Sequence, residues 1–107
     1  MTDYIQISTT TESKEDAEKI AREVVEKRLA ACAQITGPIT STYWWKDTIE
    51  EEDEWLCIMK STRELYKELE KAIKGIHLYE EPEIVAVPIV MGSRGYLEWI
   101  EKEVGSG

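Results

Sequence analysis

The only histidine of this chain, His77, is followed closely by three glutamates, Glu80, Glu81 and Glu83. Imidazole and carboxylate side chains are the groups that bind transition metals and that transfer protons in catalysis. A helix that ends at His77 would also explain the residue, because the partial negative charge at a helix C-terminus favours an imidazolium. The segment therefore admits three interpretations: a metal site, an acid–base centre, or the end of a helix before a strand.

The enzyme interpretation has little support in this sequence. A hydrolytic triad needs a base beside a nucleophile, and His77 has no obvious serine or cysteine partner. Glu80 and Glu83 could transfer protons, but glutamates are abundant here and their spacing is unspecific. Neither a P-loop nor a GxGxxG motif occurs. We therefore expect a protein that is not an enzyme.

A metal site at His77 needs more ligands than the histidine alone. Imidazole suits copper, zinc or nickel better than magnesium or calcium, and a durable site takes three or four ligands. Glu83 could supply one ligand, and further copies of the chain could supply others. A second acidic segment, residues 50–54 (EEEDE), falls at a predicted hairpin turn, where solvated charge is expected.

Composition and charge limit the partners and the location. The 107 residues carry a formal net charge of −9 and only four arginines, which disfavours binding to the phosphate backbone of nucleic acids. No apolar run is long enough to span a membrane, and the N-terminus lacks a secretory signal. We expect a cytoplasmic protein with one domain over residues 1–104, a flexible tail at 105–107, and two reduced, buried thiols on strands, Cys32 and Cys57.

The first third of the chain has the pattern of a strand followed by a helix. Apolar residues alternate over 4–8, which predicts a strand. Ser13 and Asp16 resemble a capping box, and apolar residues at helical spacing follow them. We expect this helix to end near Leu29 or Ala30.

The middle of the chain predicts a long hairpin. Residues 32–47 are rich in threonine, isoleucine and aromatic residues, which is typical of a strand. Gly37 and Pro38 must interrupt or bulge it, because proline cannot donate to a ladder. The turn is expected within 46–54, and residues 55–61 are expected to form the return strand.

The last third repeats the order of helix and strand. Ser61 and Glu64 offer a second capping box before an apolar stripe that ends at Ile76. The β-branched run 82–90 predicts a buried strand, with its internal proline at an edge or bulge, and a short helix begins at Ser93. The order β-α-β-β-α-β predicts an α+β, ferredoxin-like sandwich with an extra C-terminal helix and a long central hairpin.

The predicted hairpin is too large for one subunit. Each arm could reach about fifteen residues, whereas ordinary strands have about five or six. The hairpin also carries four large aromatic residues, and exposed aromatic residues on an unpaired edge favour association. We therefore expect an obligate oligomer in which hairpins pair across subunits in a closed ring. The aromatic residues are Tyr43, Trp44, Trp45 and Trp55.

Four segments resemble the CutA family of divalent-cation tolerance proteins. They are EKRLAACAQI, YWWKDTIEEEDEW, HLYEEPEIVAVPI and GYLEWI. The similarity extends in order over essentially the whole chain. It implies a ferredoxin-like subunit in a tight homotrimer, and it implies a role in tolerance of divalent metals, copper above all. This chain departs from the family at three positions. Leu78 stands where members commonly have a proline, Ser8 where some have a cysteine, and Ile76 where some have a second histidine.

The resemblance also indicates which residues form the site. His77 is the expected ligand of a divalent metal ion, with Cu(II) as the candidate ion, and Glu83 is a weaker candidate ligand. Four residues are expected to line the cleft between subunits: Tyr79, Glu80, Lys60 and Trp45. Two alternatives stay open. One is a trimeric sensor similar to the PII signalling proteins, binding a small anion near Lys60 or Arg94. The other is a structural trimer with no specific ligand.

Overall fold

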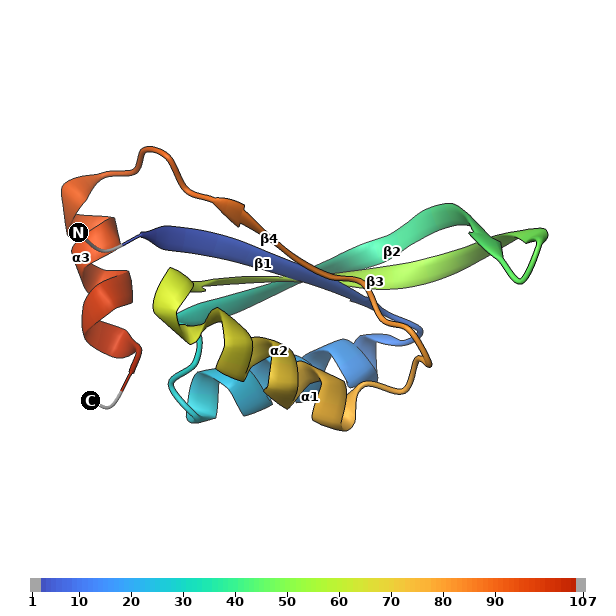
Figure 1. Cartoon of the computed structure of the whole chain (residues 1–107), viewed down its shortest axis with the longest axis horizontal. Coiled ribbons are helices and arrows are strands. Elements are labelled where there is room, and N and C mark those ends of the chain that lie inside the picture. Colours follow the sequence, from blue (N-terminus) through green and yellow to red (C-terminus); the bar gives the residue numbers. More distant parts are fainter. Residues whose placement is uncertain (1–2, 106–107) are drawn as a thin grey trace.

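Four strands form one antiparallel sheet in the order β2-β3-β1-β4. The computed structural model describes residues 3–105. Helices α1 and α2 cover one face of the sheet, and α3 lies at the end of the sheet opposite the tip of the β2–β3 hairpin (Figure 1). The predicted α+β, ferredoxin-like fold is therefore confirmed. Its elements are β1 (Tyr4–Thr11), α1 (Lys14–Glu26), β2 (Cys32–Trp45), β3 (Thr48–Thr62), the 3-10 helix η1 (Arg63–Leu65), α2 (Tyr66–Ile76), β4 (Ile84–Pro88) and α3 (Arg94–Glu103).

The core lies between the sheet and the two long helices. Alternate residues of β1 and β3 point into it, as the period of a strand requires. The apolar stripes of α1 and α2 close it from the other side. Fully buried side chains of this core include Ile7, Met59 and Cys57 from the strands and Ile20, Val24, Leu69 and Ile73 from the helices.

The first capping prediction is confirmed and the second is wrong. The Oγ of Ser13 accepts a hydrogen bond of 3.1 Å from the backbone N–H of Asp16, so α1 begins as predicted. Ser61 instead lies within β3, where its buried hydroxyl donates a 2.6 Å hydrogen bond to the carbonyl of Leu29. The sheet thus extends through Ser61, and the chain enters α2 through η1 without a side-chain cap.

The first helix is slightly shorter than predicted. It ends at Glu26, because Arg28 adopts a positive φ of 57° and turns the chain away. The N–H groups of Leu29 and Ala30 both bond back to the carbonyl of Val24, at 2.9 and 3.1 Å. Leu29 and Ala30 are therefore buried against the core as part of the connection to β2.

The central hairpin has the predicted length. Its two strands, β2 and β3, have 14 and 15 residues. The outer half of the hairpin projects beyond the helices (Figure 1). We call this outer half, residues 39–54, the arm. The turn is Lys46–Asp47, with φ values of 49° and 67°, so the strands are joined by only two residues. The prediction that the acidic residues 50–54 form the turn was wrong, because they lie within β3.

Gly37 makes the irregularity of β2 possible. The pairing of β2 with β3 shifts register between Thr36 and Ile39, as the glycine and proline predicted, and the Gly37–Pro38 peptide bond is cis. A Cβ on Gly37 would lie 2.6 Å from Cε3 of Trp55, which is far inside van der Waals contact.

Gly37→Ala is expected to lower the free energy of unfolding by about 1–3 kcal/mol, because the added methyl overpacks the site. Urea unfolding at fixed protein concentration measures the loss. Gly75→Ala is the matched control, since a Cβ at Gly75 meets nothing within 4 Å and alanine favours a helix. Equal stability of the two variants would contradict the predicted overpacking.

Strand β4 is exposed in the single chain, so the prediction of a buried strand is wrong at this level. It pairs only with β1 and forms one edge of the sheet, which suits the terminal Pro88. Val85 and Val87 are 49% and 50% exposed. The β-branched run therefore marks a sheet edge that this subunit does not cover by itself.

Three sequence-based predictions concern the termini, the membrane and α3. Gly105, the first residue of the predicted tail, donates a hydrogen bond of 2.9 Å to the carbonyl of Arg28, while 106–107 lie outside the described residues. Within 3–105 no helix combines the length and hydropathy needed to cross a membrane. The last helix follows Ser93 as predicted and buries Ile100.

Candidate functional site

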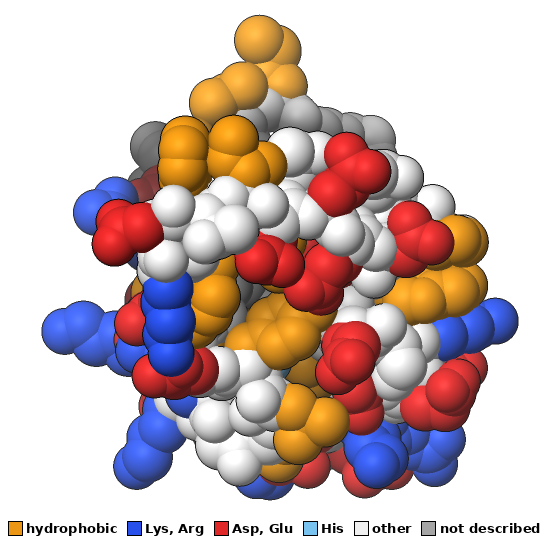
Figure 2. All heavy atoms as spheres, turned by 90° about the vertical axis from the view of Figure 1, so that its right-hand side faces the viewer, with side chains coloured by type: hydrophobic (Ala, Val, Ile, Leu, Met, Phe, Trp, Pro, Cys, Tyr) orange, Lys and Arg blue, Asp and Glu red, His pale blue; other side chains and the backbone are white. Residues whose placement is uncertain are grey.

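A cleft of about 870 Å³ lies between the arm and the segment 77–83, which connects α2 to β4. Acidic side chains surround a hollow floored by apolar groups on the face toward which the arm points (Figure 2). The residues lining the cleft include no lysine or arginine. Four aromatic residues share the lining: Tyr43, Trp44, Trp45 and Tyr79. The seven lining glutamates are Glu12, Glu50, Glu52, Glu54, Glu80, Glu81 and Glu83.

The alternation of β3 gathers three of these glutamates. Glu50, Glu52 and Glu54 are two residues apart, so their side chains share one face of the strand. They pair across the hairpin with Tyr43, Ser41 and Ile39. The same alternation was present in the sequence and could have revealed the cleft, had residues 50–54 been interpreted as a strand.

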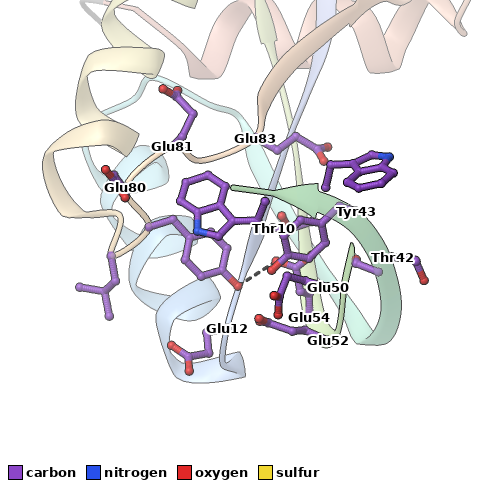
Figure 3. Close-up of a pocket in the computed structure, with 15 residues that line it drawn as sticks. Thr10, Glu12, Thr42, Tyr43, Glu50, Glu52, Glu54, Glu80, Glu81 and Glu83 are labelled. Carbon is purple, nitrogen blue, oxygen red and sulfur yellow. Dashed lines mark hydrogen bonds between the residues drawn. The ribbon is translucent and has the colours of Figure 1, made fainter. Parts of the chain in front are cut away.

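Glu54 is the most buried of the seven glutamates. Its residue is 6% exposed, and its Oε2 accepts a hydrogen bond of 2.8 Å from the Oη of Tyr79 (Figure 3). Burial, and then this hydrogen bond to a carboxylate, raise the pKa of the Tyr79 phenol well above its usual value. The phenol therefore stays protonated and serves as a fixed donor that ties the segment 77–83 to the arm.

Both ring nitrogens of His77 are occupied by hydrogen bonds. Nε2 lies 2.8 Å from the carbonyl oxygen of Thr10, and the backbone N–H of Tyr79 donates to Nδ1 at 3.1 Å. A carbonyl only accepts and an amide N–H only donates, so the proton must be on Nε2 and the lone pair on Nδ1. His77, which caps the C-terminus of α2, thus joins the end of β1 to the segment 77–83.

The structure brings together most of the predicted site residues. Tyr79, Glu80, Glu83 and Trp45 all line the cleft, and His77 lies directly behind it through its bond to Tyr79. Lys60 is the exception: it lies on β3 beyond the arm, and its Nζ donates a 2.6 Å hydrogen bond to Oε1 of Gln34.

The residues of one chain do not form a complete metal site. Glu50, Glu52 and Glu54 lie on one side of the cleft, and Glu80 and Glu81 lie on the other (Figure 3). Among residues 3–105, no group of three or more His, Cys, Asp or Glu side chains could hold a metal ion. His77 could bind a metal through Nδ1 only after releasing the N–H of Tyr79. A resident metal therefore does not fit this single chain as it is folded.

The two cysteines lie apart from the cleft. Both are free thiols on strands, as predicted. Cys57 is fully buried, and burial raises the pKa of its thiol to about 11, which leaves it unreactive at neutral pH. The prediction that both thiols are buried is wrong for Cys32, which is only half-buried because it begins the edge strand β2. Its Sγ lies 3.6 Å from the Oη of Tyr96 on α3.

Comparisons with known proteins agree on one family. Residues 5–103 match the model of the CutA1 divalent ion tolerance protein family. The divalent-cation tolerance protein CutA of Thermus thermophilus is 42% identical over 96 residues, which cover 90% of this chain and 93% of that protein. The structure of the periplasmic divalent cation tolerance protein CutA from Archaeoglobus fulgidus is 39% identical with a TM-score of 0.90, covering 98% of this chain and 100% of that one. CutA1 from Oryza sativa has 32% identity and a TM-score of 0.94, over 98% of this chain and 96% of that one.

Proposed function

Because the chain belongs to the CutA1 family of divalent ion tolerance proteins, we propose that it binds divalent cations as a homotrimer and is not an enzyme. Cu(II) is the ion that we expect to bind most tightly, because imidazole and carboxylate ligands suit copper. We also propose a cytoplasmic location.

The observation that carries this proposal is the acidic cleft. Seven carboxylates surround one cavity, and no lysine or arginine lines it. The formal net charge of −9 adds a field of the same sign. A concave surface lined by one sign of charge concentrates counter-ions, so cations gather at this cleft before any ligand binds them directly.

His77 and Glu83 are the proposed ligands that convert this attraction into coordination. The Nδ1 of His77 carries a lone pair that accepts a single hydrogen bond of 3.1 Å from the backbone N–H of Tyr79. A copper ion can take the place of this N–H donor. Glu83 lies six residues away on the same connecting segment and lines the cleft. The remaining ligands would come from a neighbouring copy, since one chain lacks them.

The exposed apolar surface of the chain supports assembly. Trp44 on the arm is 71% exposed, and Val90 and Met91 after β4 are 80% and 87% exposed. The sheet has two open edges, β2 and β4. A β2 edge that pairs with the β4 edge of the next copy gives a head-to-tail contact, and such contacts form a closed ring when the rotation from copy to copy closes.

Copper titration of the chelator-treated protein tests the cation proposal. We expect calorimetry to show binding tighter than about millimolar for Cu(II), and we expect His77→Gln to weaken it about tenfold or more, because the imidazole is lost. Since His77 is the only histidine, its ring signals in NMR spectra report the site without further assignment. Mg(II) is the control ion, because it has the same charge as Cu(II) but is not suited to imidazole ligands. It should leave the histidine signals unchanged.

Copper affinity that is unchanged in His77→Gln would contradict the assignment of the ligand. Absence of any affinity tighter than about millimolar would contradict the cation proposal itself.

A further inference from the structure

An aliphatic ammonium group already lies against the wall of the cleft. The Nζ of Lys46, from the tip of the arm, is 5.6 Å from the centroid of the Trp45 ring. The same Nζ lies 3.9 Å from Oε2 of Glu80 on the opposite segment. An ammonium over the face of a tryptophan is attracted by the negative ring face. Trp45 and Glu80 together thus form a place for an ammonium group, with the chain's own lysine against it.

Glu54 offers a second place for positive charge deeper in the cleft. This glutamate is 6% exposed, and the Oη of Tyr79 binds only its Oε2. Among the hydrogen bonds described within residues 3–105, the bond from Tyr79 is the one that the Glu54 side chain accepts, and a carboxylate has acceptor sites on both oxygens. A nearly buried carboxylate is normally paired with a cation or with several donors. The cleft therefore holds a carboxylate oxygen that is free to accept an N–H donor from a ligand.

Apart from the proposed copper ligands His77 and Glu83, the groups of this cleft suit an extended organic cation better than a hard metal ion such as Mg(II). Hard metals need several oxygens that converge at 2.0 to about 2.6 Å, whereas the glutamates of the cleft lie on opposite sides of it (Figure 3). Aromatic rings lie among the carboxylates, and methylene groups pack well on such rings. A volume of about 870 Å³ lies in the range of small-molecule sites.

From these observations we infer that the cleft binds a linear aliphatic polyamine, with one ammonium group at Glu54 and another at Trp45 and Glu80. The methylene chain between them lies along Tyr43 and Tyr79, which line the cleft. Lys46 is an internal competitor for the outer position. This inference does not depend on copper binding at His77, because none of its contacts involves the imidazole.

Calorimetric titration with spermidine, at about 0.15 M salt to screen diffuse attraction, tests the inference. We expect saturable binding at least about tenfold tighter than that of Mg(II), which has charge but no methylene chain. Trp45→Leu should weaken spermidine binding about fivefold through loss of the ring face. Glu54→Gln should weaken it about tenfold, because the buried charge is lost.

Lys46→Gln gives the sharper result, because it should tighten spermidine binding about threefold or more by removing the competitor. Lys74→Gln is the matched control: it removes the same charge from α2, where Lys74 pairs with Glu70 at 3.5 Å, and it should change affinity far less. Thermal unfolding of each variant confirms its folding. Equal affinity for spermidine and Mg(II), or equal affinity in Lys46→Gln and Lys74→Gln, would overturn the inference.

Discussion

Replacing Val87 with lysine is expected to release single subunits of 12.3 kDa from the proposed trimer. Val87 is the fourth of the five residues of β4, which forms one edge of the sheet and, among the described strands, pairs with β1 alone. Its side chain is exposed in the single chain. If β4 is covered by a neighbouring copy, the lysine ammonium must be removed from water at that contact. An unpaired buried charge of this kind costs several kcal/mol.

The effect should be large because head-to-tail contacts repeat around a ring. One substitution would change every interface of the proposed cyclic trimer at once, and each interface would lose the proposed contact of β4 with the next subunit. The lysine also discourages edge pairing directly, since natural sheets use charged residues to block their edges.

Sedimentation equilibrium at neutral pH measures the mass without a column matrix. Val25→Lys is the control, because Val25 is similarly exposed but lies on helix α1 rather than on β4. This variant should keep the mass of the unsubstituted protein. A Val87→Lys protein with that same mass would contradict the proposed interface, and a single-chain mass for the unsubstituted protein would contradict the trimer.

The long elements could be predicted because each repeats one local pattern many times. A composition rich in threonine, isoleucine and aromatic residues over 32–47 predicts the first strand of a hairpin, and the two observed strands have 14 and 15 residues. The acidic run 50–54 was misplaced because glutamates are expected in turns and disfavoured in strands. The true turn, Lys46–Asp47, contains no glycine although both residues have positive φ, so the usual sign of a two-residue turn was missing.

The exposure of β4 could not be predicted from its composition. An unbroken β-branched run is typical of a strand covered on both faces, but the sequence does not tell which chain provides the cover. In the single subunit Val85 and Val87 remain half exposed. The prediction that β4 is buried holds only if a second copy of the chain covers this strand. The Val87→Lys variant tests whether it does.

The site was predicted as a set of residues but not as a set of contacts. Tyr79, Glu80 and Glu83 are close in sequence, so their shared cleft follows from local structure. The partners of His77 and Tyr79 are distant: Thr10 is 67 residues away from the histidine and Glu54 is 25 residues away from the tyrosine. Only the fold brings them together, and it shows that the imidazole is already occupied.

His77→Ala is expected to lower the free energy of unfolding by about 2–4 kcal/mol in the presence of a chelator. The substitution removes two hydrogen bonds and leaves the carbonyl of Thr10, in a residue that is 7% exposed, without its imidazole donor. A buried polar group that loses its partner costs about 1–3 kcal/mol. The bond to Thr10 also lies directly beyond the last pair of β1 with β4, Thr9 with Ile84, so its loss should loosen the start of β4.

Two isosteric variants separate the contributions of the two ring nitrogens. His77→Gln can return a donor near Nε2 and His77→Asn can return an acceptor near Nδ1, so each should recover part of the loss. Leu78→Ala is the neighbouring control, because Leu78 is exposed and its truncation removes no buried contact. Urea unfolding at one fixed protein concentration compares all four. A loss in His77→Ala within about 0.5 kcal/mol, the range of ordinary surface substitutions, would show that the imidazole does not hold this segment in place.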